Sequence, residues 1–138
     1  MRRPGLALAV VFALALACGG AADTPEVVAQ RFVEAVQRGD VAKLLPMLEG
    51  AASRRLTAAA ERATHHVGGR RTIAPDEMLQ IVDVDPMLRV ARVELLEGDE
   101  SHARVRIHGS QQQTIDLSLV HEDGAWRVVI PTPDPPTP

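Results

Sequence analysis

The sequence predicts a small α+β domain in which helices precede an antiparallel sheet. Apolar residues recur three and four positions apart as far as residue 67, and from residue 91 they alternate with polar residues. A run of helices followed by a run of strands is typical of a fold whose helices cover one face of the sheet. With 138 residues and one cysteine, the chain has room for one domain and forms no internal disulfide.

Capping residues set the expected ends of the first two helices. Thr24 followed by Pro25 predicts an N-cap and a first-turn proline, and Gly39 ends this helix. Asp40 is expected to cap a second helix that Pro46 kinks or restarts.

A third helix is expected to begin near Ser53, with a narrow alanine-rich apolar stripe, and to end at Gly68 and Gly69. Four strands then form a curved antiparallel meander with one buried face. Their expected inward residues are Ala91, Val93 and Leu95; Ala103, Val105 and Ile107; Ile115, Leu117 and Leu119; Trp126, Val128 and Ile130. Phe32 and Trp126, the two aromatic residues after residue 17, are expected to line the core or a cavity.

The first 17 residues have the composition of an export signal. Arg2 and Arg3 precede 12 apolar residues over 6–17. As a helix, that run spans about 18 Å, against about 30 Å for a hydrocarbon core, so it is too short for a stable transmembrane anchor.

The segment 14–19 (Leu-Ala-Leu-Ala-Cys-Gly) resembles a bacterial lipobox, with Cys18 as the lipidated residue. The resemblance implies an exported lipoprotein whose acyl chains, palmitate among them, anchor it in the cell envelope, and Gly19 favours the periplasmic face of the outer membrane. Ordinary cleavage after Ala17 is the alternative, because residues 15–17 also read A-x-A. We expect residues 18–23 to be a tether and the proline-rich tail, 131–138, to be disordered.

Both ends of the domain, 24–130, resemble a nuclear-transport-factor-2-like domain, a cystatin-like α+β cone. The residues concerned are 24–45 (TPEVVAQRFVEAVQRGDVAKLL) and 122–130 (EDGAWRVVI). The resemblance implies a cone-shaped sheet wrapped around a long helix, leaving a cavity. Some members, such as ketosteroid isomerase, are enzymes that use a tyrosine. This chain has no tyrosine, so no catalytic residue is carried over.

His102, Arg104, Arg106 and His108 share one face of a predicted strand. Two arginine forks on one face are the best candidate for binding an anion or a partner. The structural alternative is the exposed polar face that any half-buried strand needs for solubility.

Two further polar clusters have structural explanations. Asp83 and Asp85 could hold a divalent cation or act as an acid/base pair, but carboxylates before a proline are more often turn residues. His65 and His66 lie at a predicted helix end, where a cation suits the helix dipole, and adjacent residues make poor joint metal ligands. We predict no metal and no cofactor.

The formal charge of the chain argues against one class of function, nucleic-acid binding. Removal of Arg2 and Arg3 changes the formal charge from −3 to −5, which is not the electrostatic pattern of a nucleic-acid-binding protein. We therefore expect a non-enzymatic envelope lipoprotein that binds a small apolar ligand or a protein partner. The alternatives are an isomerase- or hydrolase-like enzyme, and a structural module that forms a homodimer through the open sheet face.

Overall fold

The computed structural model describes residues 22–79 and 84–131. The predicted export signal, Cys18, most of the tether, Asp83 and nearly all of the tail lie outside these residues. The helical part comprises α1 (Pro25–Arg38), α2 (Val41–Leu44), the 3-10 turn η1 (Leu45–Met47), α3 (Gly50–His66) and the 3-10 turn η2 (Pro75–Met78).

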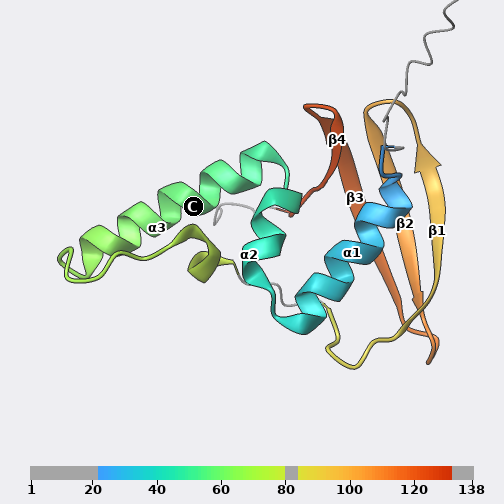
Figure 1. Cartoon of the computed structure of the whole chain (residues 1–138), viewed down its shortest axis with the longest axis horizontal. Coiled ribbons are helices and arrows are strands. Elements are labelled where there is room, and N and C mark those ends of the chain that lie inside the picture. Colours follow the sequence, from blue (N-terminus) through green and yellow to red (C-terminus); the bar gives the residue numbers. More distant parts are fainter. Residues whose placement is uncertain (1–21, 80–83, 132–138) are drawn as a thin grey trace, which may run out of the picture.

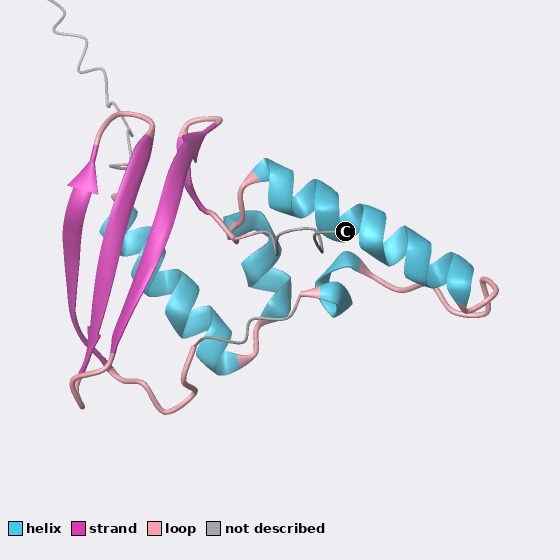
Figure 2. Cartoon of the chain, turned by 180° about the vertical axis from the view of Figure 1, so that it is seen from behind, coloured by secondary structure: helices cyan, strands magenta, loops and turns pink. Residues whose placement is uncertain are grey.

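The four strands form one antiparallel sheet in the order β1-β2-β3-β4, which confirms the predicted meander and the α+β class. They are β1 (Val90–Gly98), β2 (His102–Gly109), β3 (Thr114–Glu122) and β4 (Ala125–Val128). Helix α1 crosses one face of this sheet (Figure 1), and the opposite face is turned to the viewer in Figure 2.

The ends of α1 lie where the sequence predicts them. The Thr24 hydroxyl accepts a 3.4 Å hydrogen bond from the backbone N–H of Val27, and Gly39 has a φ of 65°, in the left-handed region that favours glycine. Asp40 occupies the predicted N-cap position of α2, but its side chain makes no capping hydrogen bond to the helix. Its carboxylate instead pairs with Lys43 at 2.7 Å, and the hydrogen bond from Lys43 lowers the pKa of Asp40.

The core fills the space between α1 and the inner face of the sheet. Phe32 and Val33 from α1 meet Val105 and Ile107 from β2, and all four side chains are buried. Leu119 and Val128 continue the same layer onto β3 and β4. Burial of these apolar side chains, without a disulfide, holds the described body together.

Strand β1 departs from the predicted alternation. Ala91 is exposed, and Leu95, also expected to face inward, is 44% exposed. The register shifts between Val90 and Arg92 and again between Leu95 and Glu97. Each such irregularity adds a residue to one strand and turns the following side chains to the other face.

Helix α3 begins at Gly50, three residues before the predicted Ser53, and ends before Gly68 as predicted. The carboxylate of Glu122, at the end of β3, accepts a 2.8 Å hydrogen bond from the N–H of Gly50 and so satisfies a free donor of the first turn. From this point α3 extends away from the sheet, with η2 packed along it (Figure 1). We call residues 50–79 the arm and the other described residues the body. The expectation that the helices as a group cover the sheet is thus wrong for α3.

Candidate functional site

The predicted row of His102, Arg104, Arg106 and His108 lies on the outer face of the sheet, opposite α1. The intervening residues of β2 are buried against the core, whereas His102 and Arg104 are exposed and Arg106 and His108 are half-buried. The alternation predicted for β2 is therefore confirmed.

Both arginines of the row are paired with carboxylates of neighbouring strands. Arg106 bonds Asp116 through two hydrogen bonds of 2.7 and 2.8 Å, and Arg104 lies 3.3 Å from Glu97. The hydrogen bond from Arg106 lowers the pKa of Asp116, and the same contact raises the pKa of Arg106. Both guanidinium groups bond carboxylates of the same sheet, so they do not form a site that is open to an external anion.

His108, the last residue of this row on β2, belongs to a second ion-paired group with Glu94 and Arg92 of β1. The His108 ring nitrogen Nε2 lies 2.7 Å from the Glu94 carboxylate, and Arg92 lies 3.4 Å from the same group. The hydrogen bond with His108, followed by the charge of Arg92, lowers the pKa of Glu94. The outer face is therefore polar and largely neutralised by its own side chains.

Ser101, His102 and Asp99 cluster at the hairpin between β1 and β2. The Ser101 hydroxyl lies 2.9 Å from both the Asp99 carboxylate and the His102 Nδ1 atom. In a serine-protease triad, the histidine contacts serine through one ring nitrogen and aspartate through the other. Here both contacts of the histidine involve Nδ1, and Asp99 accepts the backbone N–H groups of Ser101 and His102, which lowers its pKa. The cluster therefore has the geometry of a turn.

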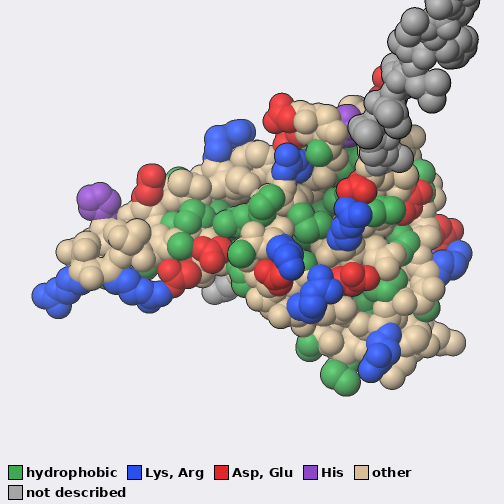
Figure 3. All heavy atoms as spheres, viewed as in Figure 1, with side chains coloured by type: hydrophobic (Ala, Val, Ile, Leu, Met, Phe, Trp, Pro, Cys, Tyr) green, Lys and Arg blue, Asp and Glu red, His purple; other side chains and the backbone are tan. Residues whose placement is uncertain are grey.

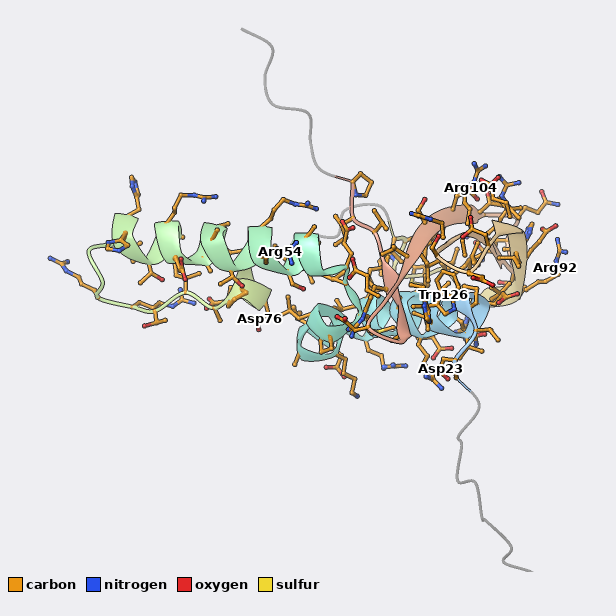
Figure 4. All side chains as sticks on the ribbon, turned by 90° about the horizontal axis from the view of Figure 1, so that it is seen from above. Asp23, Arg54, Asp76, Arg92, Arg104 and Trp126 are labelled. Atoms are coloured by element: carbon orange, nitrogen blue, oxygen red, sulfur yellow. The ribbon has the colours of Figure 1, made fainter. Side chains whose placement is uncertain are left out.

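Trp126 lies at the same end of the sheet, at the start of β4 and beside the first turn of α1. Its indole is half-buried and stacks edge-on against the His121 ring, with centroids 5.1 Å apart. Figure 4 shows it on the same side of the body as Asp23, the second described residue. Phe32, the other aromatic candidate, is a core residue that is 3% exposed.

A surface depression, which we call the Trp126 depression, opens beside this indole. Its apolar lining includes Val28 and Met47, and Arg31, Lys43 and Arg127 stand around it. Arg31 pairs with Asp23, Lys43 pairs with Asp40, and Arg127 donates to the carbonyl of Pro46. Asp23 and Asp40 neutralise two of the three cations, and Arg127 is the one without an ion pair among the described residues. The arrangement provides a largely apolar contact surface beside one guanidinium, which suits a small, mostly apolar molecule.

Sequence reasoning found Trp126 but missed the rest of the depression. Val28, Met47 and Arg127 come from α1, η1 and β4, and no motif links them in the sequence. The one available signal was an aromatic residue at the start of the last strand.

The remaining predicted clusters lie in a turn and at a helix end. Asp85 accepts a 2.8 Å hydrogen bond from the N–H of Met87, as a turn residue does. His65 and His66 are exposed in the last turn of α3. Within residues 22–79 and 84–131, no group of three or more His, Cys, Asp or Glu side chains is placed to hold a metal ion. In the same ranges, no helix combines the length and apolar character needed to cross a membrane.

Comparison with known proteins gave no match to a family model, to a curated protein or to a solved structure. The similarity to nuclear-transport-factor-2-like domains therefore stands on the quoted residues alone.

Proposed function

We propose that this protein is an envelope lipoprotein, anchored through an acylated Cys18, whose body binds a small apolar ligand in the Trp126 depression without catalysing a reaction. The lipobox-like residues 14–19 support the anchor. Helix α1 of the body starts from its N-cap Thr24, six residues after Cys18 in the sequence. Within a nuclear-transport-factor-2-like architecture, the same body would be the cone that carries the ligand.

The observation that carries the binding proposal is a half-buried indole that lies with apolar side chains beside the Arg127 guanidinium. Small-molecule sites are mostly apolar, with a few polar groups that fix orientation. The depression has this composition, with Trp126 and Met47 on its lining and Lys43 and Arg127 beside them.

The alternatives receive less support. Dimerisation through the outer sheet face would bury ion pairs such as Arg106 with Asp116, and removing such charges from water is costly. An enzyme would need titratable groups converging on a ligand, whereas His102 and His108 lie on the face opposite the core.

Labelling with palmitate tests the anchor. The full precursor, expressed in a bacterium, should incorporate labelled palmitate, and Cys18→Ala should abolish the label because it removes the thiol that accepts the lipid. Secretion of a clipped, unlabelled wild-type product would disprove anchoring.

Binding in the depression can be followed from the single tryptophan, because the chain has no tyrosine. We expect 1-anilinonaphthalene-8-sulfonate, an apolar anion, to accept excitation energy from Trp126. Ala42→Gln, which enlarges an exposed side chain lining the depression, should weaken this transfer. Ala91→Gln makes the same change at an exposed position of β1 and is the control. Equal titration curves for the two variants would place the probe elsewhere.

A further inference from the structure

Positive charge is concentrated on the arm. Residues 50–79 contain five arginines against Glu61, Asp76 and Glu77, for a formal charge of +2. The body contains eight lysine and arginine residues against thirteen acidic residues, for a formal charge of −5. Figure 3 shows basic side chains at the far end of the arm, well away from the sheet.

Several of these arginines are free to meet a partner. Arg54, Arg62 and Arg70 are exposed and form no ion pair within the part of the chain that the structure describes. On the outer sheet face, by contrast, Arg104 and Arg106 are paired with carboxylates. An external anion would therefore find available guanidinium groups on the arm rather than on the sheet.

Apolar side chains lie beside the basic ones along α3. At 3.6 residues per turn, Arg55, Arg62 and His66 fall in one row, and the adjoining stripe consists of Leu56, Ala59, Ala63 and Val67. Arg55 pairs with Glu49 and Leu56 packs against the body core, so the available part of this surface runs from Ala59 to Val67. Val67 is 44% exposed, and Figure 3 shows hydrophobic side chains following α3 toward the body.

The residues around η2 cover a different side of α3. The N–H of Ile73 donates a 2.9 Å hydrogen bond to the Thr64 hydroxyl, and Ala60 is buried beneath this segment. Figure 4 shows Asp76 on η2 at one flank of α3. The row that contains Arg62 therefore lies on the other side of the apolar stripe from η2.

We propose that the arm docks on a membrane surface of anionic phospholipid headgroups; this inference rests on the anchoring proposed above. Basic amphipathic helices bind such surfaces through arginines at the headgroups and apolar side chains at the acyl boundary. The acidic body of a second copy is the competing partner. It fits less well, because Glu94, Glu97 and Asp116 on its open sheet face already pair with their own basic neighbours.

Sedimentation with vesicles tests the arm separately from the anchor. The chain without lipid, residues 19–138, retains every described residue and therefore the whole described core. We expect it to bind phosphatidylcholine vesicles that contain phosphatidylglycerol, at low ionic strength, and not pure phosphatidylcholine. Arg62→Gln and Arg70→Gln should each reduce binding about fivefold, which corresponds to about 1 kcal/mol per arginine at an anionic surface. Added salt should reduce binding further.

The matched control is Arg89→Gln, which removes an exposed body arginine that also has no ion pair among the described residues. It should retain wild-type binding, and all variants should keep the wild-type circular dichroism. An equal loss for Arg89→Gln, or no preference for anionic vesicles, would overturn the proposal. So would low-salt self-association that the arm variants abolish, because it would assign the arm to a second copy. Palmitate labelling of the precursor is independent of each of these results.

Discussion

Arg106 on β2 bonds Asp116 on β3 through both of its carboxylate oxygens, at 2.7 and 2.8 Å. The two residues are directly opposite in the antiparallel register, so strand alignment brings them together. Glu97 on β1 and Arg104 on β2 are likewise opposite each other in the register and form an ion pair. The outer face is thus held by charge pairs between adjacent strands.

This relationship predicts a loss of stability in acid. Asp116 has its pKa lowered from 3.8 in the folded chain, chiefly by the hydrogen bond from Arg106, so the unfolded chain binds the proton more readily. The ion pair of Asp116 therefore contributes its full stabilisation at pH values above 3.8, the pKa of the unfolded chain. That stabilisation is lost as the pH falls through the lower pKa of the folded chain. Asp116→Asn should therefore lose less stability than wild type between neutral pH and acid, as measured by urea unfolding. Asp123→Asn, at an exposed carboxyl without an ion pair among the described residues, should keep the wild-type pH dependence.

The core between α1 and β2 predicts a large effect at Ile107. Its side chain is 0% exposed, so Ile107→Ala should lower the free energy of unfolding by about 2–5 kcal/mol. Leu95→Ala should cost far less, because 44% of Leu95 is already exposed. Urea unfolding followed by Trp126 emission measures both. Equal losses would contradict the bulged register of β1.

The contrast between Ile107 and Leu95 shows what the sequence could predict. Period-two alternation placed Ile107 correctly because β2 is regular, and it misplaced Leu95 because the irregularities depend on pairing with β2. Likewise, the caps of α1 are local and were predictable, whereas the direction of α3 depends on Glu122, 72 residues from Gly50. Of the candidate site, only Trp126 was visible, because the depression joins segments far apart in the chain.

The end of α1 predicts a backbone effect at Gly39. No atom lies within 4 Å of a Cβ built there, so the cost of Gly39→Ala comes from its φ of 65° alone. We expect a loss of about 1–2 kcal/mol, the usual penalty for a side chain in the left-handed region. Thermal unfolding should show a smaller loss for Gly39→Asn, because asparagine tolerates this region. Gly50→Ala, whose added methyl meets the movable end of Arg54 at 3.3 Å, is the control and should change little.

The start of α3 packs against the body core through Ala52 and Leu56, whereas the rest of the helix extends away from it, so the same substitution should have different effects in α1 and in the outer part of α3. Ala35 in α1 and Ala60 in α3 are each 2% exposed, but Ala35 packs in the body core and Ala60 packs beneath the segment around η2. Replacing either alanine with glycine weakens its helix by about 1 kcal/mol. Ala35→Gly should lower the global unfolding midpoint reported by Trp126, whereas Ala60→Gly should speed amide hydrogen exchange in α3 and leave that midpoint nearly unchanged. If Ala60→Gly shifts the Trp126 midpoint as far as Ala35→Gly does, arm and body unfold as one unit, coupled through the contacts of Ala52 and Leu56 with the body core.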